Sequence, residues 1–266
     1  MIRSAQGGVV EPRLTASSRD FFLAYGARLL SLEFMLTPRQ FIVLLALAAL
    51  SVPSSAADNQ LTPAEKASGW TLLFDGQTLN GWRPYAGKPA GGWEVKDGTL
   101  HAIAKVKGVE LITEKKYDNF EFSWEWKVPV GGNNGVKYFV TEARPKSPGH
   151  EYQMLDDNGH PDGKIGPHRQ TAAFYDVLPP AADKPSRAPG DWNSSRLVVQ
   201  GNRVEHWLNG KNVLTYELGS DAVKAGLAKS KFAKEAGFGD KITGHLMLTY
   251  HQDNCWYRNL KIRELK

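Results

Sequence analysis

Residues 120–128 (FEFSWEWKV) constrain the fold most, because apolar and polar side chains alternate strictly along them. The first, third, fifth and seventh positions are aromatic and the ninth is valine, whereas the positions between them are Glu, Ser, Glu and Lys. A period of two places alternate side chains on opposite faces of an extended chain. The segment therefore predicts a half-buried antiparallel strand, with one face in a core and the other in water.

Turn signals separate many other short apolar stretches. Asp97-Gly98, Gly201-Asn202 and Asn209-Gly210 each fall between two such stretches, and Asn-Gly favours a type I′ hairpin turn, in which both central residues need φ > 0. Short strands with few helices between them indicate an antiparallel sandwich rather than βαβ units. The further predicted strands are 71–74, 93–95, 99–102, 110–113, 135–140, 151–155, 172–177, 195–200, 203–208, 212–218, 245–250 and 256–263.

Two short helices complete the predicted fold. Residues 62–68 form a lead-in helix, and residues 220–234 begin with Ser220, a good helix-capping residue. We therefore predict one all-β domain over residues 69–266, an antiparallel sandwich with one or two short helices. The long loop at 156–170 follows a predicted strand, and loops on a rigid β scaffold are where binding residues usually lie.

The first 57 residues are typical of a targeting segment. Ten apolar residues, 41–50, follow Arg39 and precede small residues that end at Ala57. This order is that of a secretory signal peptide, and ten residues are too few to span a bilayer, which needs about 20. The predicted segments are an upstream extension from a start codon assigned too early (1–34), a signal peptide beginning at Met35 (35–57) and a short lead-in (58–68).

Export predicts a periplasmic or secreted protein that leaves the membrane after cleavage; the alternative is a genuine 34-residue extension with a membrane anchor. Cys255 is the only cysteine, so the fold has no internal disulfide and depends on its core. Without the first 57 residues the chain carries 28 basic and 25 acidic side chains. This small excess of positive charge does not indicate a nucleic-acid-binding protein.

The chain carries eight short motifs in order: LFDGQTLNGW (73–82), WEVKDG (93–98), NGV (134–136), EYQMLD (151–156), GDWN (190–193), HWLNG (206–210), SKF (230–232) and WYRNL (256–260). Together they resemble the 3-keto-disaccharide hydrolase domain family from about Gly69 to Leu265. Each motif alone is weak, but the ordered set is specific. The resemblance implies a concanavalin-like jelly-roll sandwich and action on glycosides oxidised to a ketone at sugar carbon 3.

The chain departs from the family pattern at two places. Family members often have Asn-Ser-Gly where this chain has Asn133-Asn134-Gly135, and Asp-His-Gly where it has Tyr250-His251-Gln252. His251 is therefore kept without the neighbouring aspartate.

The implied chemistry needs three groups. A ketone at carbon 3 acidifies the proton on carbon 2, so a base can remove it, and the bond from carbon 1 to the leaving sugar then breaks before water adds. The base must lie within hydrogen-bond reach, a cation or donor must hold the enolate oxygen, and an acid must protonate the leaving group. Ordinary glycoside hydrolysis instead uses two carboxylates around an oxocarbenium-like state.

Four polar residues follow from this chemistry. Glu151 and Gln153 lie two apart on a predicted strand, so they share a face. Asp156 lies where that strand enters the long loop, and His251 is the retained histidine. We predict Glu151, His251 and Asp156 as catalytic residues. The structural alternatives are a surface ion pair for Glu151 and a hydrogen-bonded core position for His251.

Other side chains are predicted to bind the sugar. Aromatic rings can stack on the apolar C–H face of a pyranose, and an arginine can donate hydrogen bonds to the enolate oxygen or a hydroxyl. Amide or carboxylate oxygens accept hydrogen bonds from sugar hydroxyls. The structural alternatives are a solvated strand surface for Glu125, a structural ion pair for Arg196 and a hydrogen-bonded wall position in a hairpin for His206. The predicted substrate-binding residues are Glu125, Gln153, Tyr152, Tyr175, Arg196, His206 and Asn209.

The sequence assigns no cofactor. Residues 156–163 (DDNGHPDG) are rich in oxygen ligands, but an EF-hand needs Glu at the twelfth position, where this chain has Pro167. A different divalent-metal site, or a transition-metal site that includes His160 and His168, stays open. The chain has no phosphate-binding loop, nucleophile elbow or CxxC pair.

Two other functions fit the same scaffold, because a fold does not determine function. One is a non-catalytic, lectin-like carbohydrate-binding module, and the other is a structural domain of the cell envelope. Carboxylate and histidine side chains around one cleft favour the enzyme, whereas a flat aromatic strip favours the binding module. The predicted partner is an oxidised sugar; the oligomeric state is not determined.

Overall fold

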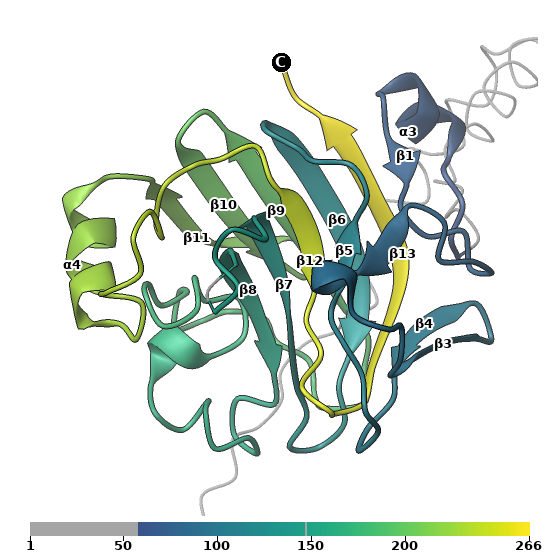
Figure 1. Cartoon of the computed structure of the whole chain (residues 1–266), viewed down its shortest axis with the longest axis horizontal. Coiled ribbons are helices and arrows are strands. Elements are labelled where there is room, and N and C mark those ends of the chain that lie inside the picture. Colours follow the sequence, from purple (N-terminus) through teal and green to yellow (C-terminus); the bar gives the residue numbers. More distant parts are fainter. Residues whose placement is uncertain (1–57, 147) are drawn as a thin grey trace, which may run out of the picture. The chain divides into compact units, whose positions relative to one another are not determined.

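The computed structural model describes residues 58–146 and 148–266, which form two antiparallel β-sheets packed face to face (Figure 1). The predicted antiparallel jelly-roll sandwich is thereby confirmed. The predicted extension 1–34 and signal peptide 35–57 lie outside the described residues. Among the described residues, no helix has the length and hydrophobicity to cross a membrane.

Sheet A has the strand order β11-β10-β9-β6-β13-β4-β3, and β1 also pairs with β13. Its strands are β1 (Thr71–Leu72), β3 (Trp93–Lys96), β4 (Thr99–Ala102), β6 (Phe120–Lys127), β9 (Asn193–Gln200), β10 (Arg203–Leu208), β11 (Lys211–Glu217) and β13 (Cys255–Glu264). Sheet B has the order β2-β5-β12-β7-β8. Its strands are β2 (Trp82–Pro84), β5 (Leu111–Thr113), β7 (Asn133–Val140), β8 (His150–Leu155) and β12 (His245–Leu248).

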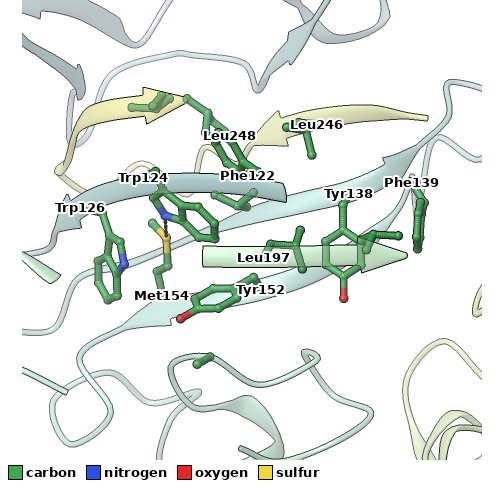
Figure 2. Close-up of a cluster of buried hydrophobic side chains, with 14 of the residues drawn as sticks. Phe122, Trp124, Trp126, Tyr138, Phe139, Tyr152, Met154, Leu197, Leu246 and Leu248 are labelled. Atoms are coloured by element: carbon green, nitrogen blue, oxygen red, sulfur yellow. Dashed lines mark hydrogen bonds between the residues drawn. The ribbon is translucent and has the colours of Figure 1, made fainter. Parts of the chain in front are cut away.

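The core lies between the two sheets. The apolar face of β6 is buried as its alternation predicts: Phe122 and Trp124 have no exposed surface. Across the core, the rings of Trp124 and of Tyr152 from β8 form a T-shaped pair with 5.0 Å between their centroids, and Nε1 of Trp124 donates to the sulfur of Met154 at 3.2 Å (Figure 2). Strand periodicity therefore decides which side chains of each sheet face the other sheet.

Local turn and helix signals at two places are also confirmed. Asn209 and Gly210 both have positive φ, 47° and 82°, at the hairpin between β10 and β11. The lead-in helix α3 (Pro63–Ala67) begins at Thr62, whose side chain accepts from the Glu65 amide while the Glu65 carboxylate accepts from the Thr62 amide. Both features depend only on nearby residues, which is why the sequence shows them.

The prediction of a strand at 172–177 is wrong. This segment forms turns beside the edge of β8, and Ala172 and Asp176 have φ of 66° and 63°, outside the extended region. It still donates to the edge strand, because the Tyr175 amide binds the Glu151 carbonyl oxygen at 3.0 Å. The segment thus covers a sheet edge and places Tyr175 next to Glu151.

The predicted helix at 220–234 is shorter than expected. Helix α4 (Asp221–Lys229) starts with Ser220 as its cap, as predicted, but ends before Ser230, whose hydroxyl donates to the Leu227 carbonyl at 2.8 Å. The next amide, that of Lys231, donates to the Asp176 carboxylate at 2.7 Å. A tertiary contact therefore stops the helix and turns Lys231 away from its axis.

Candidate active site

A cavity of about 400 Å³ lies on the outer face of sheet B, over β7 and β8. In the register of these strands Lys137 faces Glu151 and Gly135 faces Gln153. Their chain neighbour Tyr152 points the other way, into the core, and has no exposed surface. The cavity is strongly charged: three lysines, two glutamates and one histidine line it, namely Lys137, Lys146, Lys231, Glu151, Glu235 and His251.

The cavity brings together four residues that the sequence predicted: Glu151, Gln153, Tyr175 and His251. Glu151 and Gln153 are buried in its floor, only 6% and 2% exposed. His251 lies at the rim with 40% of its side chain exposed, and its Nε2 is 3.9 Å from Oε1 of Glu151. A carboxylate and an accessible imidazole thus lie close enough to act on one bound molecule.

Positive charge keeps Glu151 ionised. Burial by itself raises the pKa of Glu151, but the charges of Lys137 and Lys231 and the contact with His251 hold that pKa below its usual value. The Lys137 ammonium lies 3.6 Å from Oε2 of the carboxylate. The cavity floor therefore presents a buried anion surrounded by cations.

Gly135 makes the space that the carboxylate occupies. A Cβ atom at this position would lie 2.2 Å from Oε1 of Glu151, far inside contact distance. The close approach explains the glycine on strand β7, where a residue with a side chain would otherwise pack better.

A closed ring of hydrogen bonds positions Lys231. Its ammonium donates to the Tyr175 hydroxyl at 3.1 Å, and that hydroxyl donates to Asp162 at 2.7 Å. Arg169 binds Asp162 through Nη1 at 2.7 Å and Asp176 through Nε at 2.5 Å. Because Asp176 also accepts from the Lys231 amide, the ring returns to its start. Two loops are thereby joined, and Lys231 is held over the cavity.

Lys231 is exposed overall, but its ammonium turns inward over the Tyr175 ring, 4.3 Å from the centroid. This partial burial lowers the pKa of Lys231, although the carboxylates of Glu151 and Asp176 act in the opposite direction. A cation that bound substrate can still reach is thus placed beside a buried carboxylate. Sequence reasoning placed neither Lys137 nor Lys231 in the site, although Lys231 lies within the SKF motif.

The model of the 3-keto-alpha-glucoside-1,2-lyase-like domain matches residues 69–263, a range that contains the whole cavity. The chain belongs to this family. A curated relative, the 3-keto-disaccharide hydrolase of Bacteroides thetaiotaomicron, is 31% identical over 247 residues, covering 81% of this chain and 84% of the relative. The family resemblance that the eight motifs predicted is therefore confirmed.

Two solved structures from Parabacteroides distasonis, both described as candidate glycosyl hydrolases, have the same fold. One is 34% identical with a TM-score of 0.72 and covers 79% of this chain and 100% of its own. The other is 28% identical with a TM-score of 0.60 and covers 74% and 99%. The protein is accordingly an enzyme, a hydrolase of the glycosidase class, rather than a lectin-like module or a structural domain.

Asp156 lies outside the cavity. Its carboxylate accepts from the amides of Gly131 and Gly159, both at 2.9 Å, and of Asn158 at 3.2 Å. Burial by itself raises the pKa of Asp156, and these amides more than reverse that effect. Asp156 lines a separate hollow and holds the loop that follows β8.

Two predicted residues belong to the core between the sheets. Tyr152 donates to the Trp207 carbonyl at 3.0 Å and accepts from Ser195. His206 has no exposed surface, and burial lowers its pKa to about 4. Its Nδ1 faces the Ala172 carbonyl, which can only accept, so the ring is neutral with the proton on Nδ1. Both side chains therefore have hydrogen-bond partners in the core, and His206 is hydrogen-bonded as its structural alternative stated.

Three further predicted residues lie away from the cavity on sheet A. Glu125 accepts from the Arg258 guanidinium at 2.7 Å, and Arg196 donates to Glu121 and stacks 3.9 Å from the centroid of Trp207. The side chain of Asn209 holds the hairpin turn in place: it donates to the Pro185 carbonyl and accepts from the Ser194 amide. These residues brace sheet A, whereas the candidate site uses only the outer face of sheet B.

The oxygen-rich loop is the part of the chain that the sequence left open as a metal site. Among residues 58–146 and 148–266, no group of three or more His, Cys, Asp or Glu side chains is arranged to hold a metal ion. In the oxygen-rich loop, Asp157 binds the Thr171 amide and the Lys184 ammonium, and Asp162 binds Arg169 and Tyr175. These carboxylates already have partners within the protein, so the loop residues do not fit a preformed metal site.

Proposed function

We propose that the enzyme cleaves glycosides whose sugar ring carries a ketone at carbon 3, by elimination followed by hydration. The observation that carries this proposal is the buried carboxylate of Glu151, flanked by Lys137 and Lys231, with His251 at the rim of the same cavity. Those are the base, the positive site and the acid that the reaction needs. The names of the family and of the curated relative support it, because elimination is a lyase step and elimination plus hydration is hydrolysis overall.

In the first step Glu151 takes the proton from carbon 2, and the electron pair of that bond moves onto the ketone oxygen as an enolate. The negative charge thereby moves from the Glu151 carboxylate, which lies beside the two lysines, to the ketone oxygen of the substrate. Because the lysines stabilise the enolate as they stabilise the carboxylate, the lowered pKa of Glu151 does not remove the driving force for proton transfer.

In the second step the enolate restores the ketone, the bond from carbon 1 to the bridging oxygen breaks, and a double bond forms between carbons 1 and 2. His251 supplies the proton that the leaving oxygen takes. Water then adds, its oxygen to carbon 1 and a proton to carbon 2. One water molecule is consumed, and the products are a free sugar and a 3-keto sugar.

The remaining lining groups suit a sugar ring. Gln153 offers a buried amide on the same face as Glu151. Phe232 lines the cavity, and its ring is held in place by stacking on Phe238, with 4.1 Å between the centroids. An immobilised aromatic face and a buried amide provide the apolar contact and the hydrogen bond that orient a pyranose.

The proposed function is tested by supplying a 3-keto-disaccharide and, separately, the parent disaccharide, and by measuring the release of free sugar. We expect turnover of the ketone only, because elimination depends on the acidity of the proton on carbon 2. A folded protein that cleaves the parent disaccharide, or that releases nothing from the ketone with or without added divalent ions, contradicts the proposal.

His251→Ala is expected to lower kcat for the 3-keto-disaccharide about 10²-fold, since the leaving sugar must then depart without a proton donor. A 4-nitrophenyl glycoside of the same oxidised sugar has a leaving group that needs no protonation, and we expect its turnover to fall less than fivefold, which corresponds to about 1 kcal/mol in the activation barrier. Equal losses on both substrates would rule out His251 as the acid.

Gly135→Ala is expected to lower kcat about 10²-fold with little change in Tm, because the added methyl group displaces the catalytic carboxylate rather than the backbone. The double variant Gly135→Ala/Glu151→Gln separates this cause from others. If Gly135 acts only through Glu151, the double variant is no slower than Glu151→Gln alone. A further loss in the double variant would show that Gly135 has a different role.

We also propose export to the periplasm or the medium, with cleavage after Ala56 or Ala57, on the basis of the amino-terminal pattern alone. N-terminal sequencing of the precursor and of the mature protein tests it. A precursor that begins at Met1 would contradict the start at Met35.

A further inference from the structure

The cavity extends along the strands on both sides of Glu151. Asn133 precedes Lys137 by four residues on β7, which is about 13 Å at the usual rise of a strand. In the opposite direction the cavity reaches Gly149, two residues from Glu151 and about 7 Å away. The cavity thus has room for a second ring beside the ring that reacts at Glu151.

The side-chain amide oxygen of Asn133, at one end of this cavity, lacks a hydrogen-bond partner among the described residues. The residue is 9% exposed, and its Oδ1 is buried with no hydrogen-bond partner among the described residues. A buried acceptor without a donor destabilises the folded protein, so native proteins rarely keep one unless something else uses it. Asn133 lines the cavity, so a turn of its amide would let a ligand hydroxyl supply the missing donor.

The same end of the cavity carries His251. The backbone N–H of Asn133 donates to the Asp253 carboxylate at 3.1 Å, and this bond connects the start of β7 to the segment that carries His251. An acid for the leaving group must touch the oxygen that joins the two sugars. The leaving sugar must therefore lie on the side of Glu151 where His251 and Asn133 are found.

We propose that Asn133 binds the leaving sugar, its side-chain amide oxygen accepting a hydrogen bond from a hydroxyl of that sugar. The inference rests on the proposed function and adds to it the position of the leaving group. It makes Asn133 a specificity-determining residue that favours a polyhydroxylated leaving group over an aromatic one.

The opposite end of the cavity provides the competing arrangement. Lys146 and Glu235 line it, and both are charged side chains that bind sugar hydroxyls well. If the leaving sugar lay there, Lys146→Ala rather than Asn133→Ala would change the preference for a sugar as the leaving group.

The experiment compares kcat/KM for a 3-keto-disaccharide and for the 4-nitrophenyl glycoside of the same oxidised sugar. For Asn133→Ala we expect the ratio of the two values, disaccharide over nitrophenyl, to fall about tenfold, because only the disaccharide loses a hydrogen bond. Asn212→Ala is the matched control, since Asn212 lies on β11 of the other sheet and its side chain bonds Thr215. It should leave the ratio unchanged.

An unchanged ratio in Asn133→Ala, or a fall in Lys146→Ala instead, overturns the proposal. Thermal melting shows whether each variant is folded; if Asn133→Ala is not, Asn133→Leu removes the acceptor at a similar side-chain size, and the ratio should again fall about tenfold, whereas an unchanged ratio overturns the proposal. Failure of the proposed function is distinguishable, because the wild-type enzyme would then cleave neither 3-keto substrate.

Discussion

Glu151→Gln is expected to lower kcat for a 3-keto-disaccharide about 10³-fold, because it removes the base and keeps the shape of the side chain. The variant should still bind the substrate, since the amide can occupy the space beside Gly135 and the lysines remain. Single-turnover release of the free sugar measures the rate, and exchange of the carbon 2 proton with deuterated water shows whether proton abstraction is the step that is lost.

Glu125→Gln is the matched control for this experiment. Glu125 is a carboxylate on the outer face of sheet A, paired with Arg258, and the sequence predicted it as a substrate-binding residue. We expect turnover within a factor of two of the wild type, a range typical of surface changes. Loss of activity in Glu125→Gln with normal activity in Glu151→Gln would move the site to the other sheet.

Lys231→Met is expected to lower kcat about 10²- to 10³-fold, the usual effect of removing a donor that stabilises an oxyanion. Lys229→Met, two residues earlier at the exposed end of α4, should have no comparable effect. An activity loss that is the same in both variants would show that Lys231 acts through the loop rather than through its charge.

The pH profile provides a second readout for Lys231. Its pKa is lowered by partial burial, so the ammonium loses its proton at a lower pH than an ordinary lysine. Activity that needs the ammonium is complete below that pKa and falls as the pH rises through it. Lys231→Arg keeps the charge at all accessible pH values, so the alkaline decline should move to higher pH. An alkaline limb that stays in place would assign the decline to another group.

Most of the fold could be predicted from the sequence because its signals are local. The alternation along β6 places Phe122 and Trp124 in the core, and Asn209-Gly210 forms the hairpin turn that its conformational preference requires. The predictions for 172–177 and for the end of the helix at 220–234 were wrong for a shared reason. In both places a contact from a distant segment, Tyr175 to the β8 edge and Lys231 to Asp176, outweighs the local preference.

The site could be predicted only in part. The rule that residues two apart share a face correctly placed Glu151 and Gln153 together, and the same rule excludes Tyr152, which lies between them and points into the core. His206 likewise is buried between two partly exposed neighbours on β10. Chemical type had suggested both residues, but chemical type does not say which side of a sheet a residue is on.

The order of the motifs and the alternation of side chains were enough to predict the family, the sandwich architecture and the position of Glu151 and Gln153 on one face of a strand. Only the tertiary structure decided that this face carries the cavity and that Lys137, Lys231 and His251 surround the Glu151 carboxylate. These groups come from separate segments of the chain, and a local pattern holds no information about which segments pack together. Their proximity, which determines the charge state of Glu151, exists only after the chain has folded.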